Sequence, residues 1–146
     1  MKSSLIFCFL LACTYARSQS DQDSVAIVKL LEKAATTFRS GDAKGYADCW
    51  QVRPYSVVLV STADGKSMSV SADMMVKPSP HMGKGGFATA TNYKMSIHTD
   101  NGWTSFDEVS TAKDGTKSYS HEMWMVEKIN NEWKLVAASM HFYKQS

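Results

Sequence analysis

Cysteine is scarce in this chain of 146 residues: there are three, and Cys8 and Cys13 both lie in the N-terminal segment. If that segment is removed, Cys49 stands alone, which excludes an intrachain disulfide in the mature protein. A lone cysteine is more often a small buried apolar side chain than a nucleophile. We therefore expect Cys49 to lie in the core.

The motifs of metal and nucleotide sites are also missing. The chain has no His-x-His, Glu-x-x-His or Cys-x-x-Cys sequence and its four histidines are scattered, so we expect no metal site. Gly83, Gly85 and Gly86 do not lead from a strand into a helix, as a dinucleotide-binding loop would. There is no Gly-x-Ser-x-Gly motif of a serine hydrolase either. The sequence predicts no cofactor.

An excess of charge of either sign is lacking as well. The chain has 16 lysines and arginines and 14 aspartates and glutamates. Residues 1–18 contain Lys2 and Arg17 and no acidic residue, which leaves 14 basic against 14 acidic residues in the rest of the chain. This balance argues against a protein that binds nucleic acid or an anionic membrane through its charge.

Only the N-terminus has a long hydrophobic run. Lys2 precedes the apolar stretch Leu5–Cys13, which is the layout of a secretory signal and is well short of the roughly 20 residues that span a bilayer. The Ala-Arg-Ser sequence at 16–18 places small residues where a signal peptidase reads. We therefore predict a signal peptide over residues 1–18, a mature chain from about Gln19, and a periplasmic or secreted protein with no membrane span.

Two other interpretations of this segment are open. Leu10–Cys13 resembles a bacterial lipobox, in which Cys13 becomes a lipidated N-terminus that anchors the protein. The segment could instead be a buried helix or strand, although nothing amphipathic follows it before Asp21. The signal peptide and the lipobox both place the domain outside the cytoplasm.

Residues 19–146 have the size of one domain. Apolar side chains recur at helical spacing after Asp23, a suitable N-cap, and predict a helix over residues 23–40 that stops at Gly41. A second, short helix is expected over residues 42–50, capped by its first residue.

Beyond these helices the pattern indicates strands, which we expect over residues 55–61, 93–99, 103–111, 118–128 and 133–143. Ser71 can cap a brief helix over residues 72–76, and the segment 77–86, rich in proline and glycine, is interpreted as a flexible rim or lid. Asn101-Gly102 predicts a tight hairpin because this pair tolerates positive φ, and Asn130-Asn131 predicts another turn. Helices followed by an antiparallel meander are the α+β class.

Both faces of the last predicted strand carry apolar groups. Strict alternation puts Trp133, Leu135 and Ala137 on one face and Val136, Ala138, Met140 and Phe142 on the other. A sheet with one wet face would alternate more cleanly. One face should therefore meet the helices, and a second copy of the same sheet would cover the other. This predicts a homodimer through the sheet.

Several stretches resemble SnoaL-like proteins of the nuclear transport factor 2-like superfamily. The opening of those proteins is similar to Phe38–Asp42 with Ala47–Trp50, and a later strand is similar to Trp103–Asp107. The strongest stretch, His121–Lys128 with Asn131–Val136, is similar to the family's terminal hairpin, which reaches Glu-Lys, turns and resumes with Trp-Lys-Ile-Val. The resemblance spans essentially the whole mature chain and is carried by residues that determine the fold.

This resemblance implies a strongly curved, mostly antiparallel sheet wrapped around a long helix, which forms a cone with a pocket and often pairs sheet to sheet. Members include isomerases, cyclases, dehydratases and pockets with no known reaction, so the resemblance indicates the fold rather than the function. Relatives often carry Arg where Trp124 stands, and polar residues near Ala137 and Ser139. These departures remove polar groups on which inherited acid–base chemistry would depend.

Asp107 and Glu122 are the candidates for a general base. In the family arrangement, Trp103 and Asp107 would point to the same pocket side as Glu122 and Trp124 on the next strand, about 4.8 Å away. Two close carboxylates in an aromatic cavity would raise the pKa of one of them toward neutrality. The alternative is that both carboxylates bind backbone groups or lie at the rim.

His121 is expected near Asp107 or Glu108 on the neighbouring strand. A histidine–carboxylate pair would suit acid–base catalysis, and Tyr55 is a second candidate for a hydrogen-bond donor. The alternative is that His121 is a structural residue on a dimer face.

The aromatic residues carry a separate signal. Trp50, Tyr55, Trp103 and Trp124 could line a pocket for a planar or apolar ligand, or could fill the core. Two functions fit these features. The first is an exported protein that binds a small apolar or aromatic molecule, with weak catalysis or none. The alternative is a cofactor-independent isomerase, hydratase or cyclase with a pocket carboxylate as base.

Overall fold

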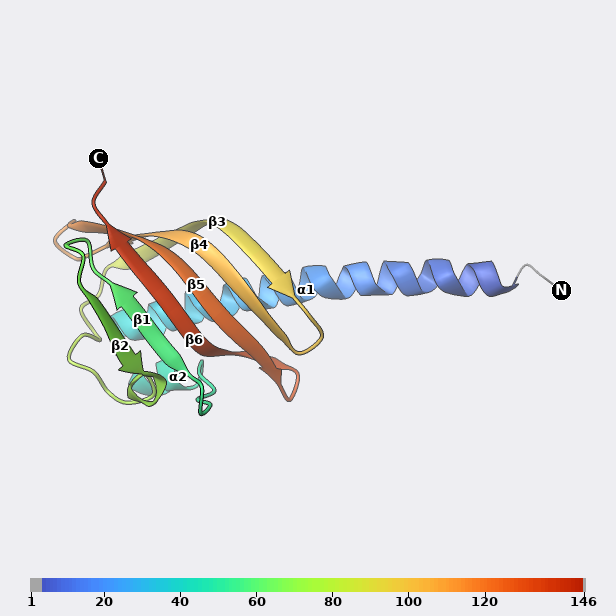
Figure 1. The fold of residues 1–146 in the computed structure, drawn as a ribbon, viewed down its shortest axis with the longest axis horizontal. Coiled ribbons are helices and arrows are strands. Elements are labelled where there is room, and N and C mark those ends of the chain that lie inside the picture. Colours follow the sequence, from blue (N-terminus) through green and yellow to red (C-terminus); the bar gives the residue numbers. More distant parts are fainter. Residues whose placement is uncertain (1–3, 146) are drawn as a thin grey trace.

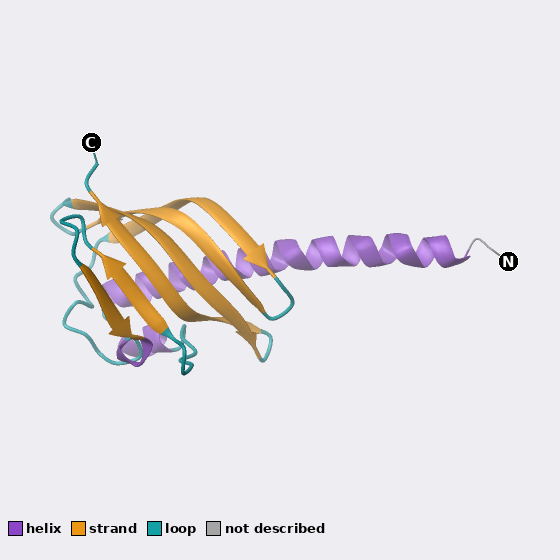
Figure 2. Cartoon of the chain, in the orientation of Figure 1, coloured by secondary structure: helices purple, strands orange, loops and turns teal. Residues whose placement is uncertain are grey.

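The computed structural model describes residues 4–145, and for residues 4–20 only the course of the backbone is described. The helices are α1 (Ser4–Ser40), α2 (Ala43–Ala47) and the short 3-10 helix η1 (Ala72–Met74). The strands are β1 (Val57–Ser61), β2 (Ser67–Ser71), β3 (Phe87–Ile97), β4 (Asn101–Thr111), β5 (Lys117–Ile129) and β6 (Glu132–Tyr143), as Figures 1 and 2 show.

One sheet contains all six of these strands, in the order β2-β1-β6-β5-β4-β3. Neighbouring strands are antiparallel except for β1 and β6, which run parallel. Helix α1 crosses one face of the sheet, and its N-terminal part extends beyond the sheet (Figure 1). We call the face that packs on α1 the inner face and the opposite one the outer face. A helix packed on a curved, mostly antiparallel sheet confirms the predicted α+β class.

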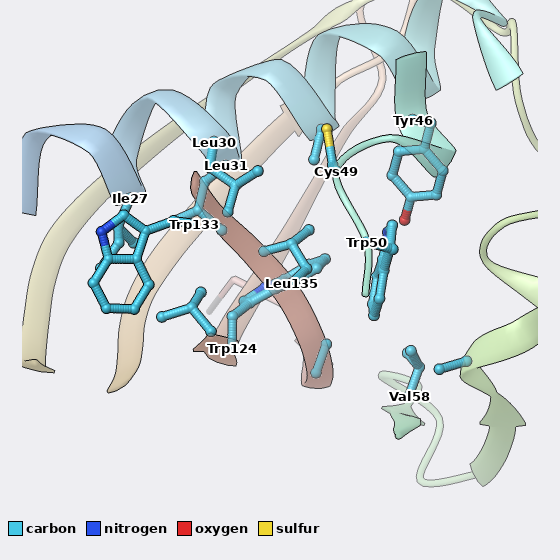
Figure 3. Packing of buried hydrophobic residues seen from close by; sticks show 14 of the residues in the cluster. Ile27, Leu30, Leu31, Tyr46, Cys49, Trp50, Val58, Trp124, Trp133 and Leu135 are labelled. Carbon is cyan, nitrogen blue, oxygen red and sulfur yellow. The ribbon is translucent and has the colours of Figure 1, made fainter. Parts of the chain in front are cut away.

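The core lies between α1 and the inner face (Figure 3). Ile27, Leu30 and Leu31 of the helix pack in one buried cluster with Trp133 and Leu135 of β6. Each large apolar side chain that is removed from water there stabilises the fold by about 2 kcal/mol. Cys49 belongs to the same cluster and is fully buried, which confirms its predicted place in the core.

Asp23 has a different role from the predicted N-cap. Helix α1 begins at Ser4, so Asp23 lies within the helix. Its carboxylate accepts hydrogen bonds from Lys128 Nζ at 2.7 Å and Trp133 Nε1 at 2.9 Å, which fasten α1 to the β5–β6 hairpin. The predicted signal segment falls on the N-terminal part of α1 and stays a prediction. Among the described residues, no helix is both long enough and apolar enough to cross a membrane.

Strand β6 contains a β-bulge that the alternation did not reveal. The pairing with β5 passes from Met125↔Ala137 to Val126↔Leu135 and leaves Val136 without a partner. An inserted residue reverses the side on which later residues point. Leu135 therefore shares the inner face with Ala138, and the predicted division of this strand into two faces is wrong. Apolar residues on both sides of the bulge conceal it in the sequence.

The β3–β4 hairpin is where it was predicted, but for a different reason. The turn lies at residues 98–100, Asn101 starts β4, and neither Asn101 nor Gly102 has a positive φ. A Cβ atom on Gly102 would lie 2.7 Å from the carbonyl oxygen of Ser96, so this glycine permits close approach of the two strands. The predicted turn at Asn130 and Asn131 is confirmed, with φ of 50° and 66°.

The weaker elements differ most from expectation. Strand β2 was not predicted, because its serines alternate with only two apolar residues, Met68 and Val70. Strand β3 begins at Phe87, six residues before the predicted start, and a bulge at Asn92 interrupts its pairing. The helix predicted over residues 72–76 is the 3-10 helix η1, and the Ser71 hydroxyl does not cap it.

Candidate functional site

Two carboxylates share the inner face beyond the apolar core. Glu108 of β4 pairs with Ser120 of β5, and Phe106 pairs with Glu122. Alternate residues of a strand point to the same side, so Glu108 and Glu122 are diagonal neighbours, which places their Cβ atoms about 7 Å apart. We call Arg39, Glu108, Ser120, Glu122 and Trp124 the inner cluster.

Arg39 enters the inner cluster from the last turn of α1. Its guanidinium donates to Glu108 Oε1 at 2.9 Å, and the two side chains are 19% and 16% exposed. The guanidinium Nε is buried and has no hydrogen-bond partner among the described residues. A buried donor without a partner costs about 1–3 kcal/mol, which makes this atom a candidate for contact with a bound molecule.

The loop 77–86 holds Arg39 in place. The amide of Gly83 donates to the carbonyl of Phe38 at 3.0 Å, and the amide of Gly85 donates to that of Arg39 at 2.8 Å. These bonds satisfy carbonyls that the end of a helix would leave unpaired. The segment contains neither helix nor strand, as predicted, and these bonds fasten its C-terminal part to α1.

Glu122 is almost completely buried, and both of its oxygens accept hydrogen bonds. Ser120 Oγ donates to Oε1 at 2.8 Å, and Trp124 Nε1 donates to Oε2 at 2.7 Å. Burial raises the pKa of Glu122, and the two hydrogen bonds oppose that rise. Glu122 is therefore a fixed, satisfied acceptor that faces Glu108.

Glu108 has a pKa shifted toward neutrality. Burial raises its pKa to about 7, the nearby Glu122 adds to the rise, and the ion pair with Arg39 opposes it. A carboxyl group with a pKa near 7 exchanges its proton readily at physiological pH, which is what a general acid or base requires.

An open depression of about 540 Å³ lies between α1 and β3. The apolar side chains that line it are Val25, Val28, Tyr93 and Met95. The Tyr93 ring packs against Phe106 with centroids 5.2 Å apart. Burial raises the pKa of its hydroxyl. The negative charges of Glu32 in the depression and of Glu108 in the inner cluster raise that pKa further. Tyr93 therefore lies between the two.

The expected pairing of Asp107 with Glu122 is wrong. Asp107 pairs with His121 and lies on the outer face, whereas Glu122 lies on the inner face. A shift of one residue in the assumed register moves every side chain of a strand to the other face. The carboxylate next to Glu122 on the inner face is that of Glu108, which the sequence suggested only as a possible neighbour of His121. Arg39 was not among the candidates.

The expected contact between His121 and Asp107 is confirmed. His121 Nδ1 lies 2.5 Å from Asp107 Oδ1, and Asn92 Nδ2 donates to Asp107 Oδ2 at 2.6 Å. These three residues occupy the outer face. Their roles in chemistry stay predictions, as do those of the aromatic residues.

Of the four aromatic candidates, the structure brings two together. Trp50 and Trp124 are buried on the inner side with ring centroids 5.6 Å apart. Trp103 lies on the outer face, and Tyr55 is 59% exposed and donates a hydrogen bond to Glu127. Tyr55 and Trp103 therefore do not line a common inner pocket with the other two. Within the described residues, no three histidine, cysteine, aspartate or glutamate side chains converge as metal ligands.

The fold was compared with solved structures. An NTF2-like protein with a cystatin-like fold from Novosphingobium aromaticivorans has a TM-score of 0.67 at 16% identity, over 93% of this chain and 92% of that one. An NTF2-like protein from Cytophaga hutchinsonii has a TM-score of 0.62 at 14% identity, over 83% and 98%. A Streptomyces avermitilis protein, whose description proposes a dehydratase of the NTF2-like family, has 0.64 at 12%, over 86% and 99%.

No protein-family model matches this sequence, and neither does any curated protein. The structural likeness shows that the chain has the NTF2-like, cystatin-like fold, as the sequence resemblance implied. At these levels of identity the likeness extends to the fold and not to an activity.

Proposed function

We propose that this protein binds a small, largely apolar molecule in the depression between α1 and β3, with a polar end directed past Tyr93 toward the inner cluster. The observation that carries the proposal is the inner cluster of buried charged groups, which acts on Tyr93, a residue that also lines the open depression. Charged groups are costly to bury and are retained where they serve a site.

The depression suits a ligand of this kind. Its volume of about 540 Å³ falls in the range of small-molecule sites, which are mostly apolar with a few polar groups that fix orientation. Val25, Val28 and Met95 offer apolar contact along its length. Arg39 offers its Nε, which has no hydrogen-bond partner in the described part of the chain, and Glu108 offers a carboxyl that can donate or accept. An aromatic body with one oxygen-bearing end matches this arrangement.

The raised pKa of Glu108 favours a second candidate function, which is cofactor-independent proton transfer. With a pKa of about 7, Glu108 can take a proton from a weakly acidic carbon of a bound molecule and return it elsewhere. This is the chemistry of an isomerase or hydratase. Glu122 supports that role by its negative field and Arg39 by its pairing with the ionised form. The proposed base is therefore Glu108 and not Asp107.

The binding proposal is tested with 1-anilinonaphthalene-8-sulfonate, an aromatic probe with an anionic end. Its fluorescence should report saturable binding, and Val28→Trp, which fills the depression, should weaken the dissociation constant at least tenfold. Val109→Trp, on the outer face of β4, is the matched control and should leave the affinity unchanged. Equal affinities for the wild type and Val28→Trp would contradict the proposed site.

We also propose that a second copy of the chain covers the outer face. Four large apolar side chains are exposed there and form the outer apolar patch: Leu59 (47% exposed), Trp103 (39%), Met123 (49%) and Met125 (50%). The register places Trp103 beside Met125 and Leu59 beside Ser139, which in turn pairs with Met123. A contiguous apolar patch on a sheet face is typical of an isologous dimer interface.

Light scattering coupled to size-exclusion chromatography tests this dimer. The wild-type protein should have twice the mass of one chain, and Met125→Glu should halve it, because a buried unpaired charge is costly. Met74→Glu is the matched control, since Met74 is 54% exposed outside the patch. A monomeric wild type, or a dimer that both variants retain, would sink the proposal.

We also propose that the protein is exported. A cleavable signal over residues 1–18 would leave the domain that contains the inner cluster intact, because Arg39 and Glu108 both follow it. Lipidation at Cys13 is the alternative route to the same compartment. The intact mass of the protein from its native membrane or periplasmic fraction distinguishes the two forms of the N-terminus.

A further inference from the structure

We propose a second site on the outer face, in which His121 acts as an acid–base catalyst for the hydrolysis of small carboxylic esters. An open hollow of about 580 Å³ marks the place. The residues that would perform this chemistry differ from those proposed for the depression between α1 and β3, although Tyr93 lines both and Glu122 also lines the hollow. Its lining comes from consecutive residues of three adjacent strands, β3, β4 and β5, and includes Asn92, Lys94, Ser105, Asp107 and His121.

Asp107 fixes the orientation of His121. The imidazole Nδ1 lies 2.5 Å from Asp107 Oδ1, and its ring stacks on Tyr143 with centroids 4.6 Å apart and planes 15° apart. Hydrogen bonds from Asn92 and His121 hold the pKa of Asp107 below its usual value, so the carboxylate is ionised and Nδ1 is the donor. Nε2 is then the ring nitrogen that is not engaged by Asp107, and the side chain is 63% exposed.

A bulge in β3 places a second hydrogen-bond donor, Asn92, against Asp107. Asn92 has a φ of 57°, in the left-handed region, and lies at the bulge between Thr91 and Lys94 where β3 leaves its register with β4. From there its amide donates to the second oxygen of Asp107 at 2.6 Å. Bulges re-aim side chains, and unfavourable backbone conformations concentrate at functional sites. Both oxygens of Asp107 are thus held, which is more than a surface ion pair requires.

Lys94 and Ser105 supply the other half of the site. They pair with each other across β3 and β4, and both line the hollow. Ser105 lies two residues before Asp107 on β4, and Asp107 pairs with His121 of β5. The Lys94 ammonium also acts on the Asp107 carboxylate through its charge. A cation and a hydroxyl beside a histidine base are the groups that stabilise the oxyanion of an acyl-transfer intermediate.

The reaction is simple hydrolysis. His121 Nε2 takes a proton from water while the water oxygen bonds to the acyl carbon, and the resulting oxyanion lies near Lys94 and Ser105. When the intermediate collapses, the bond to the alcohol oxygen breaks and the His121 imidazolium returns its proton to that oxygen. Water and ester become a carboxylic acid and an alcohol, and the acid then releases its proton to solvent. The site uses a water molecule as the nucleophile.

The test uses p-nitrophenyl acetate as the probe. Because a second copy would cover the outer face of the wild type, the rates are measured in the Met125→Glu chain, which leaves this face open. That chain should release p-nitrophenol faster than an equal concentration of free imidazole, and adding His121→Gln should lower its rate at least tenfold. Adding His98→Gln, at the tip of the β3–β4 hairpin, is the matched control and should leave the rate unchanged.

Asp107 is a positioning residue in this account. Asp107→Asn should lower the ester rate about tenfold without a comparable change in thermal unfolding, and Asp107→Glu should restore part of the rate. A Met125→Glu rate no higher than that of imidazole, or an unchanged rate after His121→Gln in that chain, overturns the proposal. Val28→Trp should leave the ester rate unchanged, so failure of this site and failure of the proposed binding site are distinguishable.

Discussion

Replacing Glu108 with glutamine is expected to make the stability of the protein less dependent on pH. The wild-type protein should become less stable as the pH rises from 5 to 8, and the variant should lack this decrease. The pKa of Glu108 rises from 4.5 in the unfolded chain to about 7 in the folded one. Between these values the folded state binds more protons, so the free energy of unfolding falls as the pH rises. The difference of pKa corresponds to roughly 3 kcal/mol at most. Glutamine still accepts a hydrogen bond from Arg39 but carries no charge.

Chemical unfolding at pH 5 and pH 8 measures this effect. The stability of Glu108→Gln relative to the wild type should increase by roughly 2–3 kcal/mol between the two pH values. Glu132→Gln removes a carboxyl that is 73% exposed on β6 and serves as the matched control. If the wild type and Glu108→Gln change in parallel with pH, Glu108 does not titrate in the way that the inner cluster requires.

Replacing Gly86 with alanine is expected to destabilise the protein by roughly 2–5 kcal/mol. Gly86 ends the loop that fastens α1 and has a φ of 79°, where a Cβ atom costs about 1–2 kcal/mol. The new Cβ would also lie 2.1 Å from the carbonyl oxygen of Thr111, and backbone cannot move aside as a flexible side chain can. The clash adds about 1–3 kcal/mol.

Gly65→Ala separates these two contributions. Gly65 has a φ of 86°, but a Cβ atom there would meet nothing within 4 Å. Its replacement should therefore cost only the backbone part, about 1–2 kcal/mol. Unfolding in guanidinium chloride compares the two variants. Equal losses of stability in Gly65→Ala and Gly86→Ala would show that the loop is not held tightly against β4.

Much of the fold follows from local patterns. The end of α1 at Gly41 was predictable because a glycine with positive φ, here 83°, terminates a helix. The positions of the long strands and of the turn at Asn130 and Asn131 were predictable because apolar runs separated by turn residues are strong signals. The cap of α2 is confirmed too, since Asp42 accepts from the amide of Gly45 at 2.8 Å.

The candidate site was less predictable, because it depends on which face each residue of a strand takes. Asp107 and Glu108 are adjacent acidic residues, and only the pairing of β4 with β5 decides that Glu108 faces inward. Bulges at Asn92 and Val136 shift that assignment again on the neighbouring strands. No local sequence signal marks an inserted residue between apolar or polar neighbours. The sequence predicted a second carboxylate beside Glu122, but it named Asp107 where the structure has Glu108.

The aromatic residues show the same limit. Trp103 and Trp124 were expected on one side, and the register separates them, with Trp103 on the outer face and Trp124 buried beside Trp50. Amino-acid type predicts that such side chains seek an apolar surface. It does not say whether that surface is the core of the same chain or the face of a second copy.

Carbon-13 NMR of the glutamate side-chain carboxyl groups tests the central claim most directly. The Glu108 resonance is assigned by its loss in Glu108→Gln and is followed from pH 3 to pH 9. The burial of Glu108 beside Glu122 predicts a midpoint near 7. A midpoint near the ordinary value of about 4.3 would contradict it, because Glu108 would then not exchange its proton at neutral pH.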